Sequence, residues 1–126
     1  MVYVPNDGLE YNARYIGQQT AGYFSWIALD DGTTVEAAGT TALTSEITTD
    51  GGERKVAVPT YEASYKAVWT TTFTFTGASF TIEGVGLFNQ LAVGGKVFMV
   101  HKLAAIKNVD SGETMEVIMK AAYGRP

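Results

Sequence analysis

The 126-residue chain contains no cysteine and only one histidine, His101. Without cysteine, the chain forms no disulfide, no thiolate metal site and no cysteine nucleophile. A domain of this length buries roughly two-thirds of its unfolded surface and needs no crosslink, so the absence of cysteine assigns no compartment. The length fits one ordinary domain and is too short for two.

Basic residues and long apolar runs are also scarce. Nine lysine and arginine residues against thirteen acidic residues give a net charge of −4, and the densest basic run is Arg54–Lys55. Nucleic-acid-binding proteins cluster basic residues to displace counterions from phosphates, so we expect no nucleic-acid partner. No run approaches the ~20 apolar residues of a membrane-spanning helix. Met1–Glu10 lacks a signal-peptide pattern. We therefore expect a soluble chain with no membrane partner and no visible export signal.

Threonine and aromatic residues are abundant instead. The chain has 16 threonines, 46% of its residues are hydrophobic and 17% are charged, which is typical of a globular protein rich in β-strands. The clearest pattern is Tyr61–Thr76, where aromatic and small residues at odd positions alternate with threonines at even positions. This alternation predicts that Tyr65, Trp69 and Phe73 are buried. The opposite face should carry Thr70, Thr72 and Thr74. At ~3.3 Å per residue the run is too long for one regular strand, so we expect a bend, a bulge or two strands.

Weaker patterns predict five further strands, over Tyr23–Leu29, Arg54–Val58, Phe80–Glu83, Lys96–Leu103 and Thr114–Tyr123. The strand at Phe80–Glu83 follows the turn signal Gly77–Ser79, so we expect it to pair with the long run as a hairpin. In the last strand, Met115, Val117, Met119 and Ala121 should face one way and Glu116 and Lys120 the other.

One short helix is predicted over Gly39–Ile47, where Leu43 and Ile47 are spaced to share a helix face. Many short strands separated by turn signals are typical of a β-sandwich or a barrel. We therefore predict an all-β fold, an antiparallel β-sandwich of jelly-roll or Ig-like type with at most one short helix, formed by residues 21–126.

Residues 1–20 follow neither the helical nor the strand period. Aromatic side chains are spaced along this otherwise polar segment, which suggests an N-terminal arm that lies against a surface, either the protein's own or a partner's. An ordinary ordered edge strand fits about as well. The candidate partner-binding residues are Tyr3, Tyr11, Tyr15 and Ile16. If the arm is not the interface, the loops at Asp30–Gly32 and Asn89–Gly95 are the next candidates.

Catalytic and metal-binding patterns are weak. His101 lies in a predicted strand, and none of the five serines occupies a Gly-x-Ser-x-Gly turn, so we expect no enzyme and no cofactor. Aspartates precede glycine at three turn signals, Asp30–Gly32, Asp50–Gly52 and Asp110–Gly112. Turn formation explains them without calcium, and we expect no metal. Gly84–Gly86 fits a strand bend or bulge better than a phosphate-binding loop.

The succession of segments resembles small β-sandwich virion proteins of tailed bacteriophages, which occur as capsid decoration (cement) proteins and as tail-fibre modules. The segments are Trp26–Thr34, Thr41–Glu46, Ile82–Asn89, Val97–Lys102 and Ile106–Val117. The most recognisable pieces are the Glu-x-x-Gly-Leu-Phe-Asn motif at Glu83–Asn89 and the Gly-Glu-Thr-Met-Glu-Val motif at Gly112–Val117.

This resemblance implies a structural role on the capsid surface of a virion and no active site. A decoration protein would bind the major capsid protein and neighbouring copies as a homo-oligomer, and a chain of this length fits that role better than a fibre, which needs a long shaft. The alternative is a tail-fibre or tail-tip module that binds a host receptor or glycan, and an esterase or glycosidase is a distant third.

Overall fold

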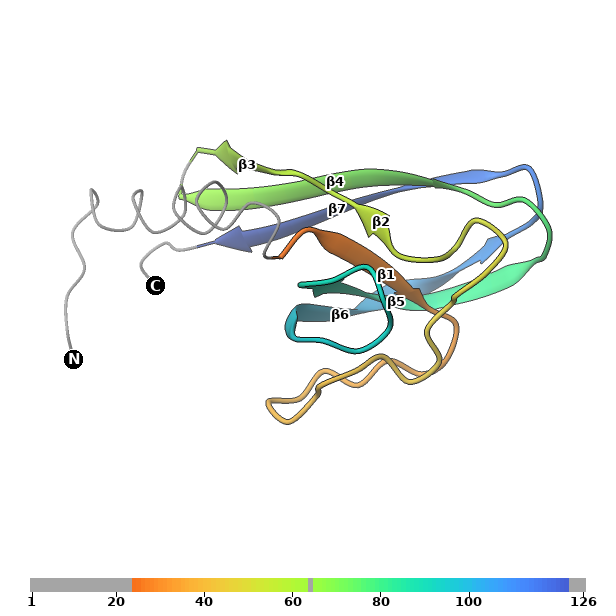
Figure 1. Cartoon of the computed structure of the whole chain (residues 1–126), viewed down its shortest axis with the longest axis horizontal. Coiled ribbons are helices and arrows are strands. Elements are labelled where there is room, and N and C mark those ends of the chain that lie inside the picture. The colour runs from red at the N-terminus through yellow and green to blue at the C-terminus, as the bar shows by residue number, and fades with distance from the viewer. Residues whose placement is uncertain (1–23, 64, 123–126) are drawn as a thin grey trace.

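A computed structural model describes residues 24–63 and 65–122, and this part of the chain consists of strands and loops without a helix. The strands are β1 (Trp26–Asp30), β2 (Lys55–Val56), β3 (Pro59–Glu62), β4 (Lys66–Thr74), β5 (Phe80–Phe88), β6 (Val97–Val109) and β7 (Thr114–Ala122). They form a four-stranded sheet in the order β2-β1-β5-β6 and a three-stranded sheet in the order β3-β4-β7, with antiparallel pairing throughout. The two sheets lie face to face (Figure 1), so the predicted antiparallel β-sandwich is confirmed.

The long alternating run folds as a hairpin of two strands, β3 and β4. Pro59 pairs with Trp69 and Tyr61 with Ala67, so odd-numbered residues stay on one face on both sides of the turn. Trp69 and Phe73 are fully buried. The threonines at 70, 72 and 74 are exposed, which confirms the predicted alternation. Tyr65 is only half-buried, contrary to prediction, because it belongs to the turn and adopts a left-handed backbone with φ 60°.

The main core fills the space between the sheets. From the four-stranded sheet it includes Ile27, Leu29, Ile82, Val85 and Leu87; from the three-stranded sheet it includes Trp69, Phe73, Met115, Val117 and Met119. In β7 the buried and exposed residues alternate strictly from Thr114 to Lys120, as the sequence predicts. The Nε1 of Trp69 donates a 2.8 Å hydrogen bond to the Phe24 carbonyl, which ties the start of the described chain to the core.

The predicted hairpin between Phe80–Glu83 and the long run is wrong. Strand β5 lies in the other sheet between β1 and β6, and β4 pairs instead with β7 over nine successive residues. From Gly84 to Phe88 every residue of β5 is buried on both faces, which suits a central strand covered on both sides. The turn after β4 therefore carries the chain from one layer to the other rather than back along the same sheet.

The predicted helix at Gly39–Ile47 is also wrong, although the apolar pair Leu43 and Ile47 is buried. Their segment belongs to a long loop that lies against the four-stranded sheet, where Leu43 joins a second small cluster with Ala28 and Phe88. The backbone groups that a helix would use bind the end of β1 instead: the Ile47 amide donates to the Leu29 carbonyl at 2.9 Å. Tertiary contacts with β1 thus replace the local helix.

The buried carboxylate of Asp30 organises this loop. Its oxygens accept hydrogen bonds from the backbone amides of Gly32, Thr44 and Ser45 at 3.0, 3.2 and 2.8 Å, and from the Thr34 hydroxyl at 2.8 Å. These four donors occupy the carboxylate fully, which accounts for the Asp30–Gly32 sequence as turn chemistry. Asp30 is therefore a structural residue rather than an open ligand.

Candidate functional site

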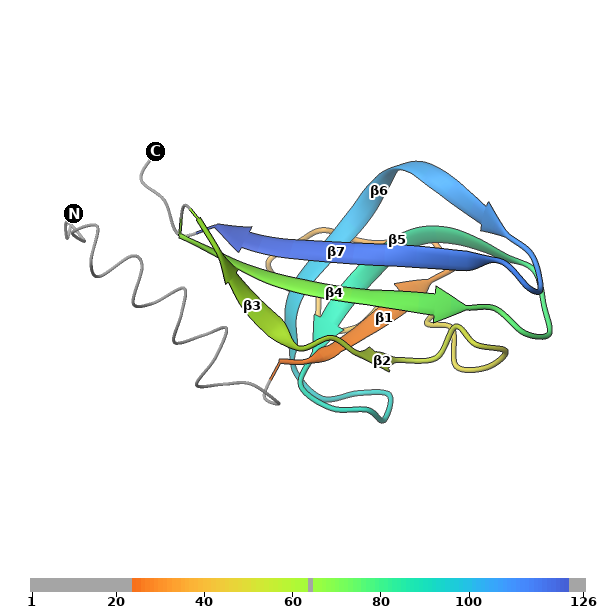
Figure 2. The same ribbon diagram turned by 90° about the horizontal axis from the view of Figure 1, so that it is seen from above.

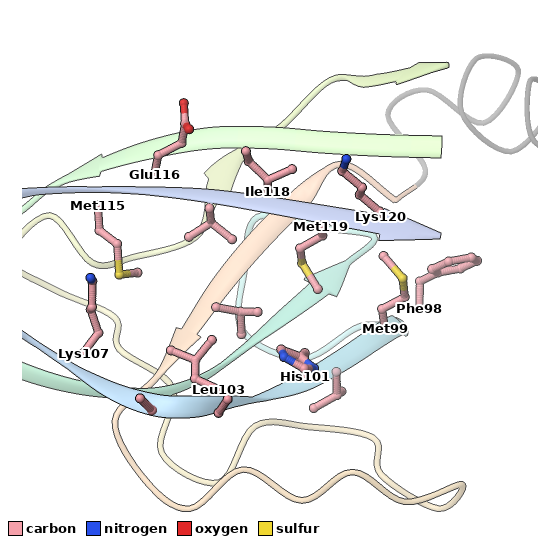
Figure 3. A pocket seen from close by; sticks show the side chains of 15 residues that line it. Phe98, Met99, His101, Leu103, Lys107, Met115, Glu116, Ile118, Met119 and Lys120 are labelled. Carbon is pink, nitrogen blue, oxygen red and sulfur yellow. The ribbon is translucent and has the colours of Figure 1, made fainter. Parts of the chain in front are cut away.

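Strands β6 and β7 are edge strands of different sheets and lie along the same side of the sandwich (Figure 2). Between them runs a groove of about 970 Å³, which we call the β6–β7 groove (Figure 3). Its apolar lining is formed by Val85, Phe98, Met99, Leu103, Met115, Val117 and Met119. Lys107 also lines it, and Glu116 and Lys120 border it with side chains that point away from β6 (Figure 3). A long apolar groove walled by two strand edges is suited to binding a polypeptide.

An irregularity in β6 opens the groove. The pairing of β5 with β6 steps from Ile82 and Lys107 to Gly84 and Lys102, so the residues of β6 between these two pairs bow away from β5. A second register shift lies near Phe98. The first shift ends at Gly84, the first residue of the predicted bend or bulge at Gly84–Gly86, but residues 84–86 themselves pair with β6 in regular register. Close approach does explain the first glycine, because a Cβ on Gly84 would overlap the Thr34 side chain.

A carboxylate from the long loop binds the edge of β6 beside the groove. Glu36 accepts a hydrogen bond from the Lys102 backbone amide and lies 3.3 Å from Nδ1 of His101. His101 is thus an exposed strand residue with an acidic neighbour, as its position in a predicted strand suggests. Within residues 24–63 and 65–122, no three histidine, aspartate or glutamate side chains gather into a metal site.

A second surface feature is the loop between β5 and β6. It exposes Leu91 and Val93, and its fold depends on Arg54, whose Nη1 donates to the carbonyls of Gln90, Ala92 and Gly94 at 3.0, 2.8 and 3.0 Å. This loop coincides with the Asn89–Gly95 region named above as an alternative interface. In the other alternative, Asp30–Gly32, Asp30 is buried and Asp31 is exposed.

The candidate arm residues Tyr3, Tyr11, Tyr15 and Ile16 lie outside the described residues. The described chain begins at Phe24, whose ring centroid lies 5.0 Å from that of Phe98 in the lining of the β6–β7 groove. The first described residue therefore lies next to this groove.

Sequence reasoning missed the β6–β7 groove. It predicted both strands and the inward residues of β7. The groove exists, however, because β6 and β7 are the last strands of their sheets and their free edges lie on the same side of the sandwich. That property depends on which strands pair over long sequence distances, and no local pattern encodes it. The nearest local signal was the pair of glycines at 84 and 86, where regular pairing of β5 with β6 resumes after the register shift.

No model of a known protein family matches this chain, and no curated protein sequence matches it. The part of the chain that the structure describes has no helix long and apolar enough to cross a membrane.

Proposed function

We propose that this protein is a structural component of a bacteriophage virion, a capsid decoration protein that stabilises the head by binding the major capsid protein and neighbouring copies. The observation that carries the proposal is the β6–β7 groove, an apolar surface between two unpaired strand edges. Such edges pair readily with strands of other chains, and apolar grooves between them bind protein segments.

The fold supports the proposal because it agrees with the β-sandwich that the resemblance implies. The segments that carry the resemblance include β1, most of β5 and the first residues of β6. A head protein is repeated many times on one particle, so a modest contact made by each copy gives strong collective attachment. A rigid sandwich with an open side suits that use.

Within the described residues, the exposed side chains favour decoration over glycan binding at a tail tip. The large hydrophobic side chains most exposed in the described residues are all aliphatic: Val35, Val56, Val58, Leu91, Val93, Ile106 and Ile118. Sugar rings are bound by stacking on aromatic rings, whereas aliphatic patches pack against other proteins. Receptor or glycan binding at a tail tip is therefore kept as the alternative that the following experiment would reveal.

The experiment is attachment of purified protein to phage heads that lack it, measured by co-sedimentation and by the temperature at which the heads release DNA. A decoration protein saturates the head surface and raises that temperature. Binding to host cells or cell-wall glycans in place of heads would support the tail-tip function instead.

A further inference from the structure

Strand β7 is the least protected edge among the described residues. It pairs with β4 through nine successive residues without a register shift, and its other side has no strand partner. It contains no proline and no bulge. Natural edge strands are normally shortened, bulged or covered, because a long regular edge pairs with other chains.

The other sheet edges show such protection. Strand β2 has two residues and β3 has four, beginning with Pro59. Strand β6 has two register shifts, and Glu36 accepts the hydrogen bond of its Lys102 amide. The contrast singles out β7 as an edge available for pairing.

The sequence of β7 is complementary to itself when read antiparallel. Its nine residues have Ile118 at their midpoint, so pairing over the full length places Ile118 opposite the partner's Ile118. Glu116 then faces the partner's Lys120, and Lys120 faces the partner's Glu116. All three side chains lie on the exposed face, and Ile118 is 52% exposed. Opposite charges and apolar pairs directly across two strands are the stabilising arrangements.

The inner face is equally compatible with this pairing. In the same register Val117 faces the partner's Met119, and Met115 faces the partner's Ala121. These residues extend the apolar lining of the β6–β7 groove, so the partner's strand would cover part of it. Lys120 already lies 3.0 Å from Glu62 in its own chain, where it lowers the pKa of that carboxyl, and it can bridge the two acidic groups.

We propose that two copies of this chain associate through their β7 strands, antiparallel about a two-fold axis at Ile118, to form one continuous six-stranded sheet. A two-fold interface uses the same patch on both copies, which the self-complementary sequence satisfies. The proposal deepens the proposed function, since it names the surface between copies, and it leaves the Asn89–Gly95 loop and residues 1–20 for the capsid. A dimer carries each capsid-binding element twice, which raises avidity.

The dimer is tested by placing charged residues at Ile118, on the proposed two-fold axis. In the full chain, Ile118→Lys places two lysines opposite each other and Ile118→Glu two glutamates, so each variant alone should dimerise about tenfold or more weakly than the wild type. Mixing the two variants places lysine opposite glutamate and should restore dimers. Ile106 is 55% exposed on β6 and outside the interface, so Ile106→Lys is the matched control and should dimerise normally. Analytical ultracentrifugation measures each mass, and thermal melts verify folding.

A cysteine crosslink tests the register independently, because the wild-type chain has no cysteine. Opposite residues in antiparallel strands have Cα atoms about 4.5–5.5 Å apart, within the range of a disulfide. Ile118→Cys should therefore form a covalent dimer under mild oxidation with diamide, and Ile106→Cys should not. A wild type that stays monomeric at hundreds of micromolar, or an Ile118→Lys variant that dimerises normally, overturns the proposal. Head attachment is measured separately, so failure to dimerise does not by itself refute decoration.

Discussion

Arg54 and Glu46 form a buried ion pair, with Nε and Oε2 2.7 Å apart and side chains only 2% and 9% exposed. A second hydrogen bond joins Nη2 to Oε1 at 2.8 Å, and the guanidinium lies 3.8 Å from the centre of the Phe88 ring. Together with the three carbonyls bound by Nη1, this contact connects two loops that are far apart in the sequence.

Removing the Arg54 side chain should therefore destabilise the folded protein. Arg54→Ala leaves the Glu46 carboxylate buried without its partner and should lower the free energy of unfolding by about 3–5 kcal/mol. The neighbouring exposed Lys55 is the matched control, and Lys55→Ala should change stability by about 0.5 kcal/mol or less. Urea denaturation of the two variants measures the difference. Equal stabilities would show that the contact adds nothing to the fold.

Asp30 should contribute more to stability than the adjacent Asp31. Asp30→Ala leaves four donors without an acceptor and should lower the free energy of unfolding by about 2–3 kcal/mol, while Asp31→Ala, at an exposed position, should be nearly neutral. Because protein donors occupy the Asp30 oxygens, millimolar calcium should leave the melting temperature of the wild type unchanged. A calcium-dependent rise in melting temperature that Asp30→Ala abolishes would contradict this interpretation.

Deletion of residues 1–20 tests the predicted arm. Residues 24–122 supply a continuous core between the two sheets, so the truncated protein should fold with a nearly unchanged melting temperature. The same deletion should sharply reduce attachment to heads if Tyr3, Tyr11, Tyr15 and Ile16 contact the capsid. If the truncated protein unfolds, residues 1–20 belong to the sandwich. If it folds and binds as before, the Asn89–Gly95 loop becomes the leading interface.

Substitution of His101 tests whether the protein needs general acid–base chemistry. His101→Ala removes the only histidine, at an exposed strand position, and should leave both folding and head attachment unchanged. Circular dichroism and co-sedimentation with heads provide the two measurements. A folded variant that attaches normally but loses a measurable virion function would indicate chemistry at this residue.

Local patterns predicted the strands better than their partners. The alternation around Trp69 and Phe73 identified buried and exposed faces correctly, because side-chain direction has a period of two in any strand. The partner of β5 was predicted wrongly, because a turn signal at Gly77–Ser79 cannot distinguish a hairpin from a crossing between sheets. Pairing depends on which strands are buried on both faces of a sheet, as β5 is, and that is a property of the whole fold.

The loop at Gly39–Ile47 shows a second limit. Leu43 and Ile47 have helical spacing, and both are buried. The amides of Thr44 and Ser45, however, donate to the Asp30 carboxylate, and the Ile47 amide itself donates to the Leu29 carbonyl. A helix prediction considers only bonds within the segment and omits an acceptor that lies about fourteen residues earlier. The β6–β7 groove was missed for the same reason, since it depends on edges that meet only in the folded chain.

The most direct test of the proposed function is an electron cryomicroscopy map of the phage particle, with this chain located by its sandwich shape and counted. The proposal predicts on the order of hundreds of copies spread over the head and in contact with the major capsid protein, because collective attachment requires repetition. A few copies confined to the tail, or none on the particle, would contradict it.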